Sequence, residues 1–183
     1  ISSILDLAVV KSEPRIVTYK YETLDMLDKL KQFLEIEKED KIKLEMKISN
    51  KLPSVLYGDE AGIIKVVLYF FDLVSSILSK KNILLEIDNI KVGNFAKLRF
   101  KFITNDKSIL NYVAEDKKTK KLKLKITNSI NYEIINNLLD KTNGNITIIK
   151  DKDNINLILS INQRLISEYD IISKKEENRN IKI

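Results

Sequence analysis

The sequence predicts an α+β fold of the two-layer α/β-sandwich class, built as one domain. Two observations lead to this class. Residues 63–78 form a long apolar segment typical of a buried helix, and shorter segments with strand or helix periodicity stand on both sides of it. Read in order, the patterns are strand, helix, strand, helix, strand, strand, an irregular region, helix, strand and strand. This order favours helices packed against a sheet.

The central helix has clear signals at its start. Asp59 stands at the cap position, where its carboxylate can accept from the free N–H groups of the first turn. Glu60 adds negative charge at the positive end of the helix dipole. From residue 63 onward, apolar side chains cover most of the circumference, which predicts a helix buried on nearly all sides. The remaining polar side chains form a narrow stripe of Lys65, Asp72, Ser76 and Ser79.

The other elements follow from their periodicity. Apolar residues at helical spacing predict helices over residues 1–10, 24–39 and 130–139. Thr23 can cap the second of these, and Asn143-Gly144 predicts the turn that ends the third. Alternating or β-branched patterns predict strands over residues 16–21, 42–48, 83–90, 96–103, 146–149 and 155–161. Gly93-Asn94 predicts a hairpin turn between the two middle strands.

Composition excludes several function classes. With 183 residues, 44% of them apolar, the chain can bury the core of one domain. Cysteine and histidine are absent, so the 183 residues can form no disulfide and supply no imidazole base and no histidine phosphoacceptor. Charges interrupt every apolar segment before it reaches bilayer length. The net charge of +6 rests on 28 Lys and only four Arg, which favours a solvated surface over phosphate or base recognition.

Two stretches resemble a known family. The loop Leu-Pro-x-Val-x-x-Gly-Asp at residues 52–59, followed by the apolar helix, resembles the entry to the ATP-binding domain of sensor histidine kinases. That domain belongs to the wider ATPase family of Hsp90, gyrase B and MutL. ISSILDLAVVKSE at residues 1–13 resembles the end of the second helix of the kinase dimerisation hairpin. The resemblance implies a Bergerat-type sandwich, with helices on one face of a mixed sheet.

The resemblance also implies a division of the chain. Residues 1–12 would be the end of a dimerisation-hairpin helix, and residues 16–162 the histidine-kinase-like ATPase domain. Residues 163–183 are polar and charged, which predicts a linker toward a possible following domain. The end of this segment, EENRNIKI, resembles the approach to the first strand of a receiver domain.

On the central helix, the resemblance locates the positions that bind nucleotide in the family. The family carries two asparagines four residues apart, and the second helps to hold Mg²⁺. These positions fall on Tyr69 and Leu73. Neither can ligate Mg²⁺, which requires hard oxygen ligands. Asp72 and Ser76 lie within one turn and are the fallback ligands if the register is slightly different.

After the strand at residues 96–103, the family's adenine-binding aspartate falls on Thr104, or on Asp106 after a two-residue slip. The two glycines of the same motif fall on Asp106 and Ser108, where a side chain occupies space that a nucleotide needs. The ATP lid of the family ends in glycines, but no glycine stands between Asn94 and Gly144. The region instead holds a run of lysines that is either a solvated, shortened lid or a contact surface for an acidic partner, namely Lys117, Lys118, Lys120, Lys121, Lys123 and Lys125.

These departures predict a degenerate domain, for which we expect no catalytic residue, no ATP or magnesium cofactor and no metal site. The favoured hypothesis is a pseudo-ATPase domain, an interaction or allosteric module of two-component-type signal transduction or a phosphorelay. The alternative is an active but divergent histidine protein kinase that binds Mg-ATP through Asp106, Asp72 and the lid lysines. A second alternative is a Lys-rich binder of nucleic acid or an anionic surface.

The resemblance further implies where the domain acts and with what. It implies a protein partner, a homodimer formed through upstream helices, and a possible receiver domain downstream. Nucleic acid is not the expected partner, because Arg is scarce and no aromatic residues are interleaved with the basic ones. The implied location is cytoplasmic, with membrane attachment only through other segments of a longer protein.

Overall fold

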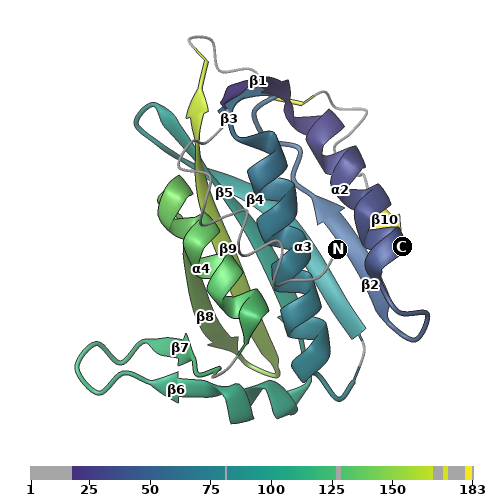
Figure 1. The fold of residues 1–183 in the computed structure, drawn as a ribbon, viewed down its shortest axis with the longest axis vertical. Helices are drawn as coiled ribbons and strands as arrows, with labels where there is room; N and C mark the ends of the chain where they lie inside the picture. Colours follow the sequence, from purple (N-terminus) through teal and green to yellow (C-terminus); the bar gives the residue numbers. More distant parts are fainter. Residues whose placement is uncertain (1–17, 81, 127–128, 167–170, 173–179, 183) are drawn as a thin grey trace.

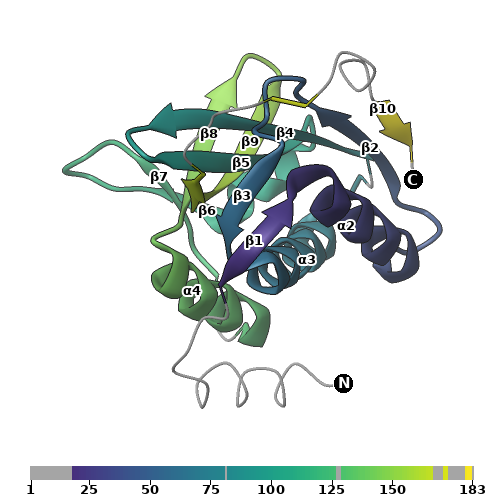
Figure 2. The same cartoon turned by 90° about the horizontal axis from the view of Figure 1, so that it is seen from above.

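The computed structural model describes residues 18–80, 82–126, 129–166, 171–172 and 180–182. Within them the chain forms two layers, a mixed sheet and three α-helices that all cover the same face of that sheet (Figures 1 and 2). The predicted α+β sandwich is therefore confirmed. The helix predicted over residues 1–10 lies outside the described residues.

The helices agree closely with their predicted ranges. They are α2 (Thr23–Glu37), α3 (Glu60–Ile77) and α4 (Ile130–Thr142). A short 3₁₀ helix, η1 (Lys107–Tyr112), lies between α3 and α4 in the chain. In the part of the chain that is described, no helix is long and apolar enough to cross a membrane. The end of α4 is as predicted, because Asn143 adopts the left-handed conformation and the Gly144 N–H donates to Leu139 O.

The sheet has a central path with one extra pair of strands. Along the path the order is β10-β2-β4-β5-β9-β8-β7-β6, while β1 pairs with β3 and β3 pairs with β9. β2 and β4 are parallel and the other pairs are antiparallel, so the sheet is mixed, as the resemblance implied. The strands are β1 (Tyr19–Glu22), β2 (Lys43–Ile48), β3 (Val55–Gly58), β4 (Asn82–Val92), β5 (Phe95–Thr104), β6 (Val113–Glu115), β7 (Leu122–Leu124), β8 (Asn145–Asp151), β9 (Asn154–Leu165) and β10 (Asn180–Lys182).

The core lies between the helices and the inner face of the sheet. Alternate residues of β4, β5 and β9 point inward, so that Phe102 stands between Leu85 and Leu157 in the register. The Phe102 ring packs edge to face on Phe70 of α3, with 5.2 Å between the centroids, and stacks on Phe71 at 6.5 Å. These contacts fix α3 on the centre of the sheet, as predicted for a helix with so little polar surface.

Two local expectations about the first elements are corrected. Thr23 does not cap α2, since its hydroxyl instead donates to Pro53 O and its N–H donates to Ser54 O at 2.9 Å. Both bonds attach the start of α2 to the loop before β3. β3 itself lies in a stretch that the sequence predicts as loop, and it forms because β1 and β9 offer it partners.

The described parts of residues 163–183 contact the domain. β9 continues to Leu165, because Gln163 and Arg164 extend the ladder with Ala96 and Phe95. Further on, Ile172 is buried and its N–H donates to Leu52 O at 3.0 Å. β10 then adds antiparallel to the outer edge of β2.

Candidate functional site

The entry to α3 is built as the sequence predicts. The Gly62 N–H donates to Asp59 Oδ1 at 2.9 Å, which satisfies one free donor of the first turn. Just before the cap, the buried Gln163 side chain accepts from the Tyr21 hydroxyl at 2.9 Å and packs onto Gly58. A Cβ at Gly58 would lie 1.7 Å from Gln163 Oε1, so this contact requires glycine. The entry to α3 is thus fixed by contacts from β1 and β9.

The two asparagine positions of the resembling family lie in different surroundings. Leu73 faces the core and only 4% of its surface is exposed. Tyr69 is partly buried and lines a groove of about 550 Å³ between α2 and α3, together with Leu68 and Lys65. An aliphatic side chain in the core offers no oxygen to a metal ion. Position 73 therefore serves packing.

The fallback ligands are already engaged within the protein. Asp72 is exposed, and its Oδ2 accepts from Asn131 Nδ2 of α4 at 2.6 Å. The Ser76 hydroxyl donates to Leu73 O at 2.7 Å, a bond to the preceding turn of its own helix. Asp72 thereby links α3 to the start of α4, the helix that follows the lid region.

At the end of β5, the three predicted positions lie together and bind one another. Thr104 and Asp106 are both buried, and the Asp106 N–H donates to Thr104 Oγ1 at 3.1 Å. Asp106 Oδ1 accepts from the Ser108 N–H at 3.0 Å, which caps η1. The Ser79 hydroxyl lies 3.1 Å from both carboxylate oxygens, and Oδ2 also accepts from the Lys80 N–H.

The electrostatics of Asp106 follow from these contacts. Burial raises the pKa of this carboxyl, but the hydrogen bonds from Lys80, Ser108 and Ser79 outweigh burial and lower the pKa to about 2. The carboxylate is therefore ionised at neutral pH and both of its oxygens are used. Ser79 and Lys80 stand just after α3, so Asp106 connects the end of β5 to the end of that helix.

The residues at these positions do not fit a magnesium nucleotide. One helix position is a buried leucine, and the glycine positions hold Asp106 and Ser108, which bind the loop after α3. Within the described residues, no group of three or more acidic side chains is placed to hold a metal ion.

Residues 113–124, in the part of the chain where the resemblance places the ATP lid, form a β-hairpin. β6 and β7 pair with Val113 opposite Leu124, and Leu122 pairs with Ile148 of β8. The region appears irregular in the sequence because its elements are only three residues long. A signal for β7 was nevertheless present, since lysine and leucine alternate strictly over residues 121–125.

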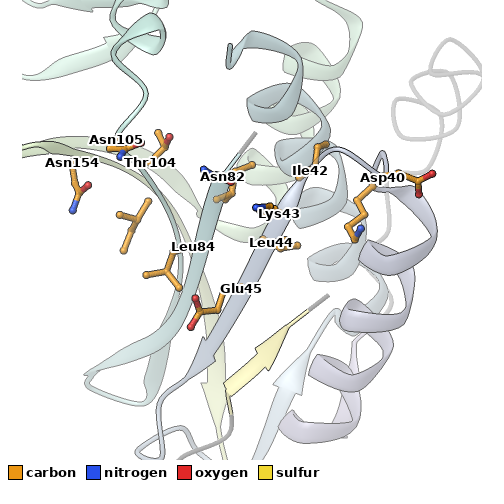
Figure 3. Close-up of a pocket in the computed structure, with 13 residues that line it drawn as sticks. Asp40, Ile42, Lys43, Leu44, Glu45, Asn82, Leu84, Thr104, Asn105 and Asn154 are labelled. Carbon is orange, nitrogen blue, oxygen red and sulfur yellow. The ribbon is translucent and has the colours of Figure 1, made fainter. Parts of the chain in front are cut away.

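A groove of about 680 Å³ lies at one end of the sheet (Figure 3). Its floor includes Glu45, Leu84 and Ile103, which are in register across β2, β4 and β5 and alternate with residues that face the helices. Lys38, Asp40 and Asn154 belong to its lining. This groove is thus open on the face opposite the helices, away from Tyr69 and Leu73.

The fold combines an apolar helix packed on the centre of a mixed sheet with a β-hairpin before α4, and it is similar to that of histidine kinase ATP-binding domains. Three solved structures share it. AdeS of Acinetobacter baumannii, a histidine kinase, matches with a TM-score of 0.60 and 14% identity, covering 87% of this chain and 74% of its own. Full-length ShkA in complex with AMPPNP matches with a TM-score of 0.63 and 13% identity, covering 91% of this chain and 35% of its own.

The third is the catalytic domain of the histidine kinase ThkA in a nucleotide-free form, with a TM-score of 0.55 and 12% identity, covering 79% of this chain and 95% of its own. At such identities the likeness concerns the fold, and in that sense the resemblance found in the sequence is confirmed. By sequence, neither a protein-family model nor a curated protein matches the chain.

Proposed function

We propose that this chain is a histidine-kinase-like domain without ATP chemistry, which acts as an interaction or allosteric module in two-component-type signal transduction. The observation that carries the proposal is the placement of Leu73. In the resembling family this position supplies an oxygen to Mg²⁺, whereas here it is an aliphatic side chain in the core. The engagement of Asp106 by Ser79, Lys80 and Ser108 supports the same conclusion at the other side of the site.

The role in signalling is inferred from the fold and the resemblance. On this proposal the partners are proteins, the chain pairs as a homodimer through upstream helices, and a receiver domain is the candidate downstream neighbour. The likeness to AdeS and ThkA, both histidine kinases, supports a place in such a system. A cytoplasmic location belongs to the same proposal.

A thermal-shift titration with Mg-ATP tests the loss of nucleotide binding. A ligand that binds only the folded state raises the melting temperature progressively as its concentration exceeds the dissociation constant. We expect no shift for this chain, and a clear shift for the ShkA protein as the positive control. A shift that grows with Mg-ATP, and that is absent with magnesium alone, would contradict the proposal.

An active, divergent kinase remains the alternative, and one observation favours it. ShkA, which has the same fold, is described in complex with AMPPNP. On this alternative Mg-ATP binds through Asp106, Asp72 and the lysines before α4, and Asp72 lines the groove between α2 and α3. If Mg-ATP stabilises the chain, Asp72→Asn should abolish that shift, while the distant Asp40→Asn should leave it unchanged.

A further inference from the structure

The β6–β7 hairpin carries most of the excess charge of the protein. Residues 115–125 hold six lysines and two acidic residues, a net charge of +4, against +6 for the entire chain. All six lysines are exposed. Lys123 forms a loose ion pair with Asp116, with 3.8 Å between Lys123 Nζ and Asp116 Oδ2. Exposed lysines so close together repel one another, so a partner with negative charge would be favoured there.

The tip of the hairpin has a defined backbone. The Lys118 and Thr119 N–H groups both donate to Asp116 Oδ1 at 2.9 Å, and the Lys120 N–H donates to Asp116 O at 2.8 Å. The Asp116 N–H closes the loop by donating to Lys121 O at 2.8 Å. Lys120 takes a left-handed φ of 59° within this turn. The lysines of the tip therefore stand on a fixed turn.

The base of the hairpin is attached to the rest of the domain by backbone hydrogen bonds. The Lys125 N–H donates to Tyr112 O at 2.6 Å, and Leu122 of β7 pairs with Ile148 of β8. Leu124 is buried, so Lys121, Lys123 and Lys125 alternate with apolar residues that face the protein. In both views the loop between β6 and β7 extends outward past β8, away from α2 and α3 (Figures 1 and 2).

We propose that the β6–β7 hairpin is a docking surface for an acidic segment of a partner protein. The proposal deepens the interaction role proposed above and rests on it. Two features favour carboxylates over the phosphates of nucleic acid. Residues 113–126 contain no arginine and no aromatic residue, and so lack the groups that grip phosphate in a bidentate manner or stack on bases. Glu115 and Asp116 also interrupt the positive surface, which suits a discrete set of carboxylates rather than a continuous row of phosphates.

The test measures binding of fluorescent poly-L-glutamate to the full chain by anisotropy, at low and high salt. The hairpin variant replaces Lys117, Lys118, Lys120 and Lys121 by Gln. The matched control makes the same replacement at four exposed lysines in β1, in β2 and in the loop just before β2. These are Lys20, Lys41, Lys43 and Lys47. Both variants change the net charge by the same amount, and the thermal melt of each shows that the fold is retained.

We expect the hairpin variant to bind poly-L-glutamate about tenfold or more weakly, because several exposed charge pairs are lost together. The control should lose much less affinity. Equal losses in the two variants would overturn the proposal, because binding would then follow net charge alone. It would also be overturned if the wild-type chain failed to bind poly-L-glutamate at low salt. Tighter binding of an oligothymidylate of equal length through the same lysines would assign the surface to nucleic acid instead.

A second pair of variants tests whether the turn matters. Asp116→Asn and Asp116→Ala both remove one negative charge, but only asparagine keeps an oxygen that can accept from Lys118 and Thr119. We expect Asp116→Asn to bind poly-L-glutamate at least as tightly as wild type, and Asp116→Ala to bind more weakly than Asp116→Asn. Equal affinity of the Asp116→Asn and Asp116→Ala variants would overturn the idea that the turn holds the lysines in place for binding. Mg-ATP titrations of the same proteins report on the proposed function independently, so the two failures are distinguishable.

Discussion

The two ends of α3 use the same device in different settings. At its start, Asp59 accepts from the first turn beside Gly58 and Gly62, and Gly58 leaves room for Gln163. Near its end, Asp106 accepts from Ser79 and Lys80, and it stands where the resembling family has glycine. The chain has four glycines, and none lies at the family's nucleotide positions. The comparison shows that glycine is present at position 58, where the fold requires it, and absent from the positions at which the resemblance locates the nucleotide-binding glycines.

The largest effect is expected from restoring the family residue in the core. Leu73→Asn places an amide where 4% of the side chain is exposed, so we expect a loss of about 3–4 kcal/mol from the free energy of unfolding. Leu73→Met, which keeps volume and polarity, should cost less than about 1.5 kcal/mol. Urea denaturation measures both. An asparagine variant that is as stable as wild type and binds Mg-ATP would show that this position is open to a ligand.

A smaller loss is expected at the start of α3. Gly58→Ala drives a Cβ into Gln163, whose displacement breaks the buried bond from Tyr21, and we expect a cost of about 2 kcal/mol. In a Gln163→Ala background the same Gly58→Ala change should cost much less, because the clashing side chain is gone. A double-mutant cycle by urea denaturation checks this, and strictly additive effects would refute the contact.

Asp106 makes stability depend on pH. Its pKa of about 2 in the folded protein lies below the ordinary 3.8, so the folded state binds fewer protons than the unfolded state in this range. The contribution, up to about 2 kcal/mol, is complete above the unfolded pKa and is lost as pH falls through 3.8 toward 2. We expect urea midpoints of the wild type to fall between these pH values, and those of Asp106→Asn to fall less. Parallel curves for the two proteins would argue against this role.

The smallest effect is expected at the β4–β5 turn. Gly93 has a φ of +58°, and a Cβ there would contact nothing within 4 Å, so only conformational strain distinguishes glycine from alanine. Gly93→Ala should cost about 1 kcal/mol, and Gly93→Asn less, since asparagine tolerates the left-handed region. Urea midpoints of the two variants check this order. If alanine and asparagine proved equally costly, strain could not be the cause.

Sequence reasoning succeeded where the signal is local. The Asp59 cap, the apolar circumference of α3 and the Asn143-Gly144 end of α4 depend on neighbours within a turn or two, and all three were predicted correctly. It failed where a partner lies far along the chain. Thr23 looks like a cap, but its hydroxyl binds Pro53 O, thirty residues away. β3 has only four residues and forms through distant partners in β1 and β9.

The site shows the same limit. The resemblance located five positions on α3 and just after β5, but it could not show what each side chain contacts; they are Tyr69, Leu73, Thr104, Asp106 and Ser108. Two donors to Asp106, Ser79 and Lys80, stand 27 and 26 residues earlier in the loop after α3, and Asn131 reaches Asp72 across 59 residues. Such bonds depend on how α3, η1 and α4 pack together, and no local pattern encodes them.

The attachment of β7 to β8 has a mechanical consequence. A lid that is part of a sheet cannot swing over the central helix without giving up ladder bonds, so its resting position is set by the strands beneath it. Any force that a partner applies at the hairpin tip is transmitted directly to β8 and β9. In this molecule the hairpin is therefore mechanically continuous with the sheet.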